Sequence, residues 1–234
     1  MSFRHVIALA ALLGAGSLAA QEAAPPAGAP NTAAAAPAAP LKPGDATAGQ
    51  AKIATCGACH GIDGNPASSQ YPKLAGQHES YIARQIELIK SNQRQNPVMM
   101  GFIASMTAQD MHDVGAYFAT KTSLPGVADA KLVARGEALY RGGDKATGTP
   151  ACMACHGPDG RGNPGAGYPQ VAGQFADYVT QKLKDWRDGK KWSDDDKGAI
   201  MPAVAHGLND NDIAALATYI EGLHATDAGH TAAK

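Results

Sequence analysis

The sequence predicts an all-α protein made of two tandem helical domains. Apolar residues recur at helical spacing in several segments, and no run alternates apolar and polar residues with a period of two, so we expect no substantial sheet. The second half of the chain repeats the motifs of the first half in the same order, which indicates two copies of one domain. A chain of 234 residues is long enough for two small domains.

The first twenty residues have the pattern of a signal peptide. Arg4 and His5 form a short basic region, an apolar run rich in Ala and Leu follows, and cleavage near Ala19 or Ala20 fits the small residues there. The run is short for a membrane-spanning helix, which needs about 20 apolar residues. We therefore expect export to the periplasm and a mature protein that does not span a membrane, with an uncleaved anchor as the alternative.

The remaining chain divides by composition. Residues 21–43 are mostly Ala and Pro, with scattered Gly, Thr and Asn, and bury too little apolar area to offset their ordering entropy, so a disordered tether is expected. The repeats place a first domain at 44–124 and a second at 130–224, joined by a segment that contains Pro125 and Gly126. Residues 225–234 are then a C-terminal tail.

Each predicted domain has a first, a middle and a last helix. Thr107 begins a capping-box pattern before the last helix of the first domain, and Asn209 is the corresponding cap in the second. Gly115 interrupts the last helix of the first domain without an evident reason. The expected first helices cover 45–56 and 130–140, and the expected middle helices cover 78–91 and a segment from Phe175 to Trp186.

The repeat includes the spacing Cys-x-x-Cys-His, which is the attachment pattern for haem c. Two thiols about one helical turn apart can form thioethers with one porphyrin, and the adjacent His can reach the iron from the same face. A zinc site or a redox dithiol is the alternative, but His directly after the second Cys is poorly placed to share a tetrahedral ion with both thiolates. The two copies are Cys56, Cys59 and His60, and Cys152, Cys155 and His156.

The chain resembles the dihaem cytochrome c4 family over roughly residues 44–223. The paired Cys-x-x-Cys-His motifs, the repeated Tyr-Pro-x-Leu/Val-Ala-Gly-Gln segment, the positions of the methionines and the closing helices carry the resemblance. It implies two class I cytochrome c domains packed about a pseudo-twofold axis, each wrapped around one covalent haem c with His and Met on the iron. It also implies electron transfer toward respiratory oxidases.

Pro72 and Pro169 follow the two motif histidines by twelve and thirteen residues. In class I cytochromes c a proline at this place accepts a hydrogen bond from the proximal His, which would fix the orientation and tautomer of the imidazole. The resemblance therefore assigns the two prolines to the haem sites, and a role in turn formation alone is the alternative.

Methionines are the expected second axial ligands. Met201 lies eight residues before the cap Asn209, and Met99 lies eight residues before the cap Thr107. We therefore prefer Met99 to its neighbour Met100, on the expectation that both lie on an extended loop where adjacent side chains point in different directions. The alternatives to a Met ligand are water or a histidine, for which His78, His112 and His206 are available.

The predicted site favours an electron carrier over an enzyme. A thioether ligand stabilises ferrous iron and fills the sixth position, which leaves little room for a substrate. We expect a periplasmic protein that passes single electrons from a membrane donor complex to a terminal oxidase or reductase. The alternatives are a cytochrome subunit of a larger dehydrogenase or oxidase, and a dihaem peroxidase. The net charge of −1 does not indicate nucleic-acid binding.

Overall fold

A computed structural model of the protein describes residues 41–224, which belong to one compact unit. The predicted signal peptide, most of the predicted tether and the predicted tail lie outside these residues. The described part is helical, and strand pairing within it is limited to two isolated bridges, Asp144–Thr149 and Asn163–Tyr168. No helix between residues 41 and 224 combines the length and the apolar character that crossing a membrane requires.

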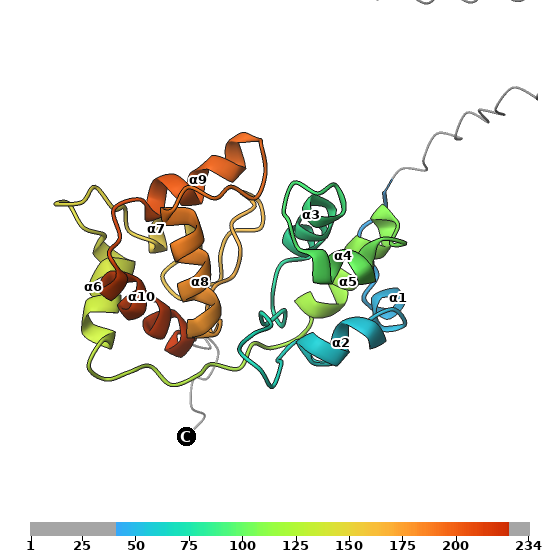
Figure 1. Ribbon diagram of the computed structural model, residues 1–234. Helices are drawn as coiled ribbons and strands as arrows, with labels where there is room; N and C mark the ends of the chain where they lie inside the picture. Colours follow the sequence, from blue (N-terminus) through green and yellow to red (C-terminus); the bar gives the residue numbers. More distant parts are fainter. Residues whose placement is uncertain (1–40, 225–234) are drawn as a thin grey trace, which may run out of the picture. The chain divides into compact units, whose positions relative to one another are not determined.

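The helices between residues 41 and 224 form two successive groups of five, which Figure 1 shows in blue to green and in yellow to red. The first group comprises α1 (Ala46–Gln50), α2 (Ala54–His60), α3 (Glu79–Lys90), α4 (Pro97–Ile103) and α5 (Ala108–Ala119). The second group comprises α6 (Val133–Gly142), α7 (Met153–His156), α8 (Ala176–Arg187), α9 (Asp196–Ala205) and α10 (Asp210–Gly222).

Each group of helices buries its own apolar core. The first core gathers Ile82, Ile86 and Ile89 of α3 with side chains of α5 such as Phe118, which is fully buried. The second gathers side chains of α6, α8 and α10, including the fully buried Leu139. Because no residue of one half belongs to the core of the other, the chain has two domains, as the sequence repeat predicted.

The helix boundaries agree with the predictions best where a side-chain cap is present. Thr107 and Asn209 both form complete capping boxes, with Asp110 and Asp212 at the third helical position. The predicted helix at 45–56 is wrong in one respect: α1 ends at Gln50, and a turn separates it from α2, which contains the first motif. This turn directs Ile53 into the core, where it is 4% exposed.

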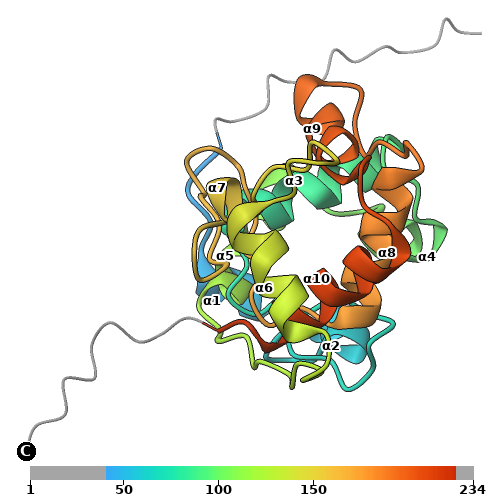
Figure 2. The same cartoon turned by 90° about the vertical axis from the view of Figure 1, so that its left-hand side faces the viewer.

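Glycines allow the first and last helices of each domain to cross closely. A methyl group at Gly49 of α1 would lie 2.1 Å from the carbonyl oxygen of Asp113 in α5, and one at Gly136 of α6 would lie 2.2 Å from that of Ala215 in α10. Figure 2 shows α6 and α10 side by side. Gly115 has a similar role, because a methyl group there would lie 2.6 Å from the carbonyl oxygen of Glu79.

Gly136→Ala is expected to destabilise the protein by about 2 kcal/mol, because the backbones of α6 and α10 must separate to accommodate the added methyl group. Thermal unfolding of the haem-loaded protein measures this effect. Gly142→Ala in the same helix is the control: nothing lies within 4 Å of the new methyl group, so the better helix propensity of Ala should leave stability unchanged or slightly higher. Equal unfolding temperatures for the two variants would contradict the close-crossing argument.

Candidate functional site

The first motif lies on α2, so its two cysteines are separated by about one helical turn. Both thiols are free and half-buried, and the side chain of Cys56 packs against the first core. His60, the last residue of α2, is 7% exposed. Its Nδ1 lies 2.9 Å from the carbonyl oxygen of Pro72.

The second motif reproduces this arrangement on α7. Cys152 is the N-cap of this short helix, and Cys155 and His156 follow within it. Both cysteines are again free and half-buried. The Nδ1 atom of His156 lies 2.9 Å from the carbonyl oxygen of Pro169, the same distance as in the first domain.

The hydrogen bond to proline selects one tautomer of each motif histidine. A carbonyl oxygen can only accept, so Nδ1 must donate, and the neutral ring keeps its lone pair on Nε2. Burial lowers the pKa of His60 and His156, against the smaller opposing effect of the carbonyl bond. Both rings are therefore neutral at pH 7, with Nε2 available to a metal.

The thiols and imidazoles fit covalently attached haem. Burial raises the pKa of the Cys56 thiol and raises the pKa of Cys152 to about 11. Each domain thus presents two free thiols on one helical turn beside a neutral imidazole, which matches the donors that a haem c needs. Within residues 41–224, no three His, Cys, Asp or Glu side chains are gathered as a metal ion alone would require.

The methionines lie on helices, and the expectation of an extended loop was wrong. Met99 and Met100 are in α4, and Met201 is in α9. Pro202 sits inside α9, where it has no N–H to donate to the carbonyl of Gly198 four positions earlier. Adjacent residues on a helix point about 100° apart, so Met99 and Met100 still point in different directions.

The methionine that lies eight residues before the cap of the last helix packs on the core in both domains. The side chains of Met99 and Met201 pack against the first and second cores, whereas Met100 is half-buried and belongs to neither core cluster. Four residues after each of these two methionines, the helix ends at a buried residue, Ile103 or Ala205.

The three histidines considered as alternative ligands have different surroundings. His112 on α5 bonds to Glu79, with its Nδ1 2.9 Å from Oε1. His206 is exposed at the end of α9. His78, the N-cap of α3, has a buried Nε2 without a hydrogen-bond partner, and burial lowers its pKa.

Sequence reasoning missed several tyrosines around the motifs. The rings of Tyr71 and Tyr168 lie 6.1 Å and 6.4 Å from those of His60 and His156, measured between centroids. The repeated Tyr-Pro pair was the available signal. Two further tyrosines hold the residues after each motif: Tyr117 Oη donates to the carbonyl of Ile62 at 2.9 Å, and Tyr140 Oη donates to that of Gly157 at 2.7 Å.

The repeated Tyr-Pro-x-Leu/Val-Ala-Gly-Gln segments pair with one another across the two domains. The side chain of Gln77 bonds to the backbone N–H and C=O of Gln170, at 3.0 Å and 2.9 Å. The side chain of Gln174 bonds in the same way to Lys73, at 2.9 Å and 3.0 Å. Since Gln77 corresponds to Gln174 and Lys73 to Gln170, the exchange is reciprocal, as a pseudo-twofold relation requires.

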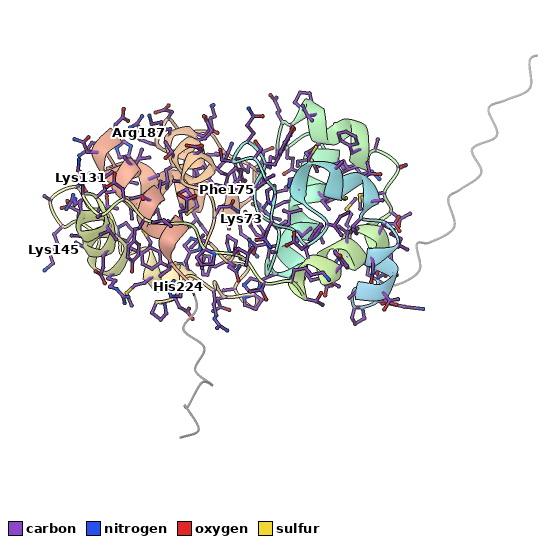
Figure 3. The ribbon with its side chains drawn as sticks, turned by 90° about the horizontal axis from the view of Figure 1, so that it is seen from below. Lys73, Lys131, Lys145, Phe175, Arg187 and His224 are labelled. Carbon is purple, nitrogen blue, oxygen red and sulfur yellow. The ribbon has the colours of Figure 1, made fainter. Side chains whose placement is uncertain are left out.

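Lys73 departs from this symmetry. Its buried ammonium donates to the carbonyl oxygens of Leu124, in the connecting segment, and of Gly173, at 2.5 Å and 2.6 Å. It also lies 4.4 Å from the ring centroid of Phe175, and Figure 3 shows these two side chains together. Burial lowers the pKa of Lys73. The connecting segment is thereby held to both domains.

The cytochrome c family model matches residues 46–121 and again 133–224. With the two Cys-x-x-Cys-His helices, this match makes the chain a c-type cytochrome with two covalently bound haem groups. Cytochrome c4 of Pseudomonas aeruginosa is 49% identical over 181 residues, which cover 77% of this chain and 90% of the relative. The chain therefore belongs to the cytochrome c4 family, as its motifs predicted, and is a dihaem electron-transfer protein.

Solved structures agree with this assignment. The reduced recombinant cytochrome c4 from Pseudomonas stutzeri is 44% identical, with a TM-score of 0.74, and the match covers 77% of this chain and all of that one.

A more distant relative by sequence is the thiosulfate dehydrogenase electron acceptor of Stutzerimonas stutzeri. It is 31% identical over 182 residues, which cover 74% of this chain and 81% of the relative.

Proposed function

We propose that this protein carries single electrons in the periplasm, from a respiratory donor complex in the membrane to a terminal oxidase or another acceptor. The observation that carries the proposal is the duplicated site: in each domain a neutral motif histidine held by a proline carbonyl, and a methionine helix packed on the same core. Haem bound there supplies a one-electron couple between ferric and ferrous iron.

Corresponding residues have the same proposed roles in both domains. Cys56 and Cys59, like their counterparts Cys152 and Cys155, attach the haem covalently. His60 and His156 are the proximal ligands, and Pro72 and Pro169 orient their rings. Met99 and Met201 would supply the second protein ligand to each iron, and their neutral thioethers would favour the ferrous state and occupy the sixth position.

Two arguments support the periplasmic location. Residues 1–20 have the pattern of a signal peptide, and haem c is attached outside the cytoplasm. One relative is named for accepting electrons from thiosulfate dehydrogenase, which favours a second candidate function: association with a dehydrogenase as its cytochrome subunit. Purification of the native protein separates the two candidates. A free carrier elutes alone, and a subunit copurifies with its enzyme.

Electron exchange with small redox proteins is expected to be fast and peroxide turnover slow, because both sixth positions are filled. Stopped-flow oxidation and a peroxide assay on the same preparation measure the two rates. Met201→Ala is the control: it opens one sixth position and should raise peroxide turnover. Rapid, saturable peroxide turnover by the undamaged parent protein would instead support a dihaem peroxidase.

A further inference from the structure

The start of α9, the helix that carries Met201, is held by a residue of the first domain. Arg84 projects from α3 and donates from one guanidinium nitrogen, Nη2, to Asp195 Oδ2 at 2.7 Å and to Ser193 Oγ at 3.2 Å. The Arg84 side chain is 33% exposed, so the ion pair is partly shielded from water. These contacts join residues more than 100 positions apart in the sequence.

Asp195 connects this ion pair directly to the helix. It is the N-cap of α9, and its other carboxylate oxygen, Oδ1, accepts from the backbone N–H of Gly198 at 3.1 Å and from Ser193 Oγ at 2.6 Å. The Ser193 and Arg84 bonds lower the pKa of Asp195 to about 2, so the carboxylate stays charged at neutral pH. Movement of Arg84 is therefore transmitted to the first turn of α9.

The loop that contains Ser193 and Asp195 is tightly packed against the start of α9. Ser193 is 4% exposed, and a methyl group at Gly198 would lie 2.0 Å from the carbonyl oxygen of Ser193. The loop and the first turn of α9 thus pack backbone to backbone. A shift of Ser193 and Asp195 must move the helix that carries Met201, because there is no gap to absorb it.

A second arginine of the first domain supports the same loop. The guanidinium of Arg94 lies 3.7 Å above the ring centroid of Trp192 and donates to Tyr178 Oη at 3.2 Å. The Trp192 ring lies 4.6 Å from that of Trp186, measured between centroids, and Trp186 packs against the second core, as Met201 does. Both ends of the loop 192–195 are therefore held from the first domain.

The cap of the first domain's methionine helix is not itself bonded to the other domain, although Arg94, two residues before this cap, contacts Tyr178 and Trp192 of the second domain. Asn96 caps α4 within its own domain by accepting from the N–H of Met99 at 3.1 Å. Among the hydrogen bonds and ion pairs of residues 41–224, none joins α4 or this cap to the second domain. Gln181 occupies the position of Arg84 in the repeat, and it bonds within its own helix to Asp185.

We propose that Arg84 and Arg94 are positioning residues through which the first domain holds Met201 at the haem iron of the second domain. The inference rests on the proposed role of Met201 as a ligand. It makes the state of the second site depend on the interface between the domains.

Carbon monoxide binding to the reduced protein tests this proposal, because the gas occupies the sixth position only when the methionine leaves it. Arg84→Gln is expected to speed carbon monoxide binding at one haem by about fivefold, the factor that a partly exposed ion pair supplies. Asp195→Asn should act in the same direction, because Asn still caps a helix but removes the charge that Arg84 binds. Hydrogen exchange in residues 196–205 should also become faster.

The controls separate positioning from general loosening of the interface. Ser69→Ala removes another bond between the domains, from Ser69 Oγ to Asp177 at 2.6 Å, without touching α9, and should leave binding unchanged. Arg84→Lys keeps the charge and should restore part of the parent behaviour. The effect of Arg84→Gln should persist when Met99→Ala is added and vanish when Met201→Ala is added.

Two results would overturn the proposal in distinguishable ways. If Met201→Ala opens one haem to carbon monoxide but Arg84→Gln and Asp195→Asn bind the gas at the parent rate, the arginines do not position the methionine. If Met201→Ala itself leaves carbon monoxide binding and the optical spectrum unchanged, Met201 is not a ligand, and the underlying assignment fails first.

Discussion

Protein in which Cys56 and Cys59 are both replaced by Ala is expected to retain one covalent haem instead of two. Each motif lies on its own helix, in its own domain and beside its own core, so loss of one attachment site leaves the other intact. Intact mass and haem staining after denaturing electrophoresis measure the result. The parent should exceed its polypeptide mass by two haem groups and the variant by one.

The mirror variant, with Cys152 and Cys155 both replaced by Ala, is the matched control and should also lose one haem. We further expect the emptied domain to lose helix content, because a unit of this size has few large apolar side chains and the haem completes its core. Circular dichroism measures that loss. Retention of both haem groups by either variant would show that the Cys-x-x-Cys-His helices are not the attachment sites.

Met99→Ala is expected to abolish the methionine–iron charge-transfer band of one haem. It should also lower that haem's reduction potential by about 0.1 V or more, within the roughly 0.8 V range that axial ligands set. The physical reason is that water or another harder ligand replaces a thioether that stabilises ferrous iron. Optical spectroscopy and a spectroelectrochemical titration measure the two effects.

Met100→Ala is the control that tests the register. Met100 is half-buried on α4 and is not part of the first core, whereas Met99 packs against that core with its backbone N–H bonded to the cap Asn96. The Met100 variant should therefore keep both the band and the potential. The opposite outcome, in which Met100→Ala loses the band and Met99→Ala keeps it, would mean that the assignment from the capping boxes is wrong.

Much of the candidate site could be predicted because it depends on local sequence. Two thiols and an imidazole on one helical turn need only their spacing, and the capping boxes at Thr107 and Asn209 need only side chains three residues apart. The capping boxes and the two bonds to Pro72 and Pro169 were found as expected. The helices α4 and α9 were not predicted: α4 is too short for a clear apolar period, and α9 contains Pro202, a residue that disfavours a helix interior.

By itself, then, the sequence determined the two tandem helical domains, the attachment of two haem groups and the family, since these depend on periodicity, spacing and repetition along the chain. Only the tertiary structure decided why Gly115 is needed and how the domains hold one another. Gly115 meets the backbone of Glu79, and Arg84 reaches Asp195 across the two domains. Such contacts join residues far apart in the chain, and their geometry arises only when the packed helices bring the two backbones together.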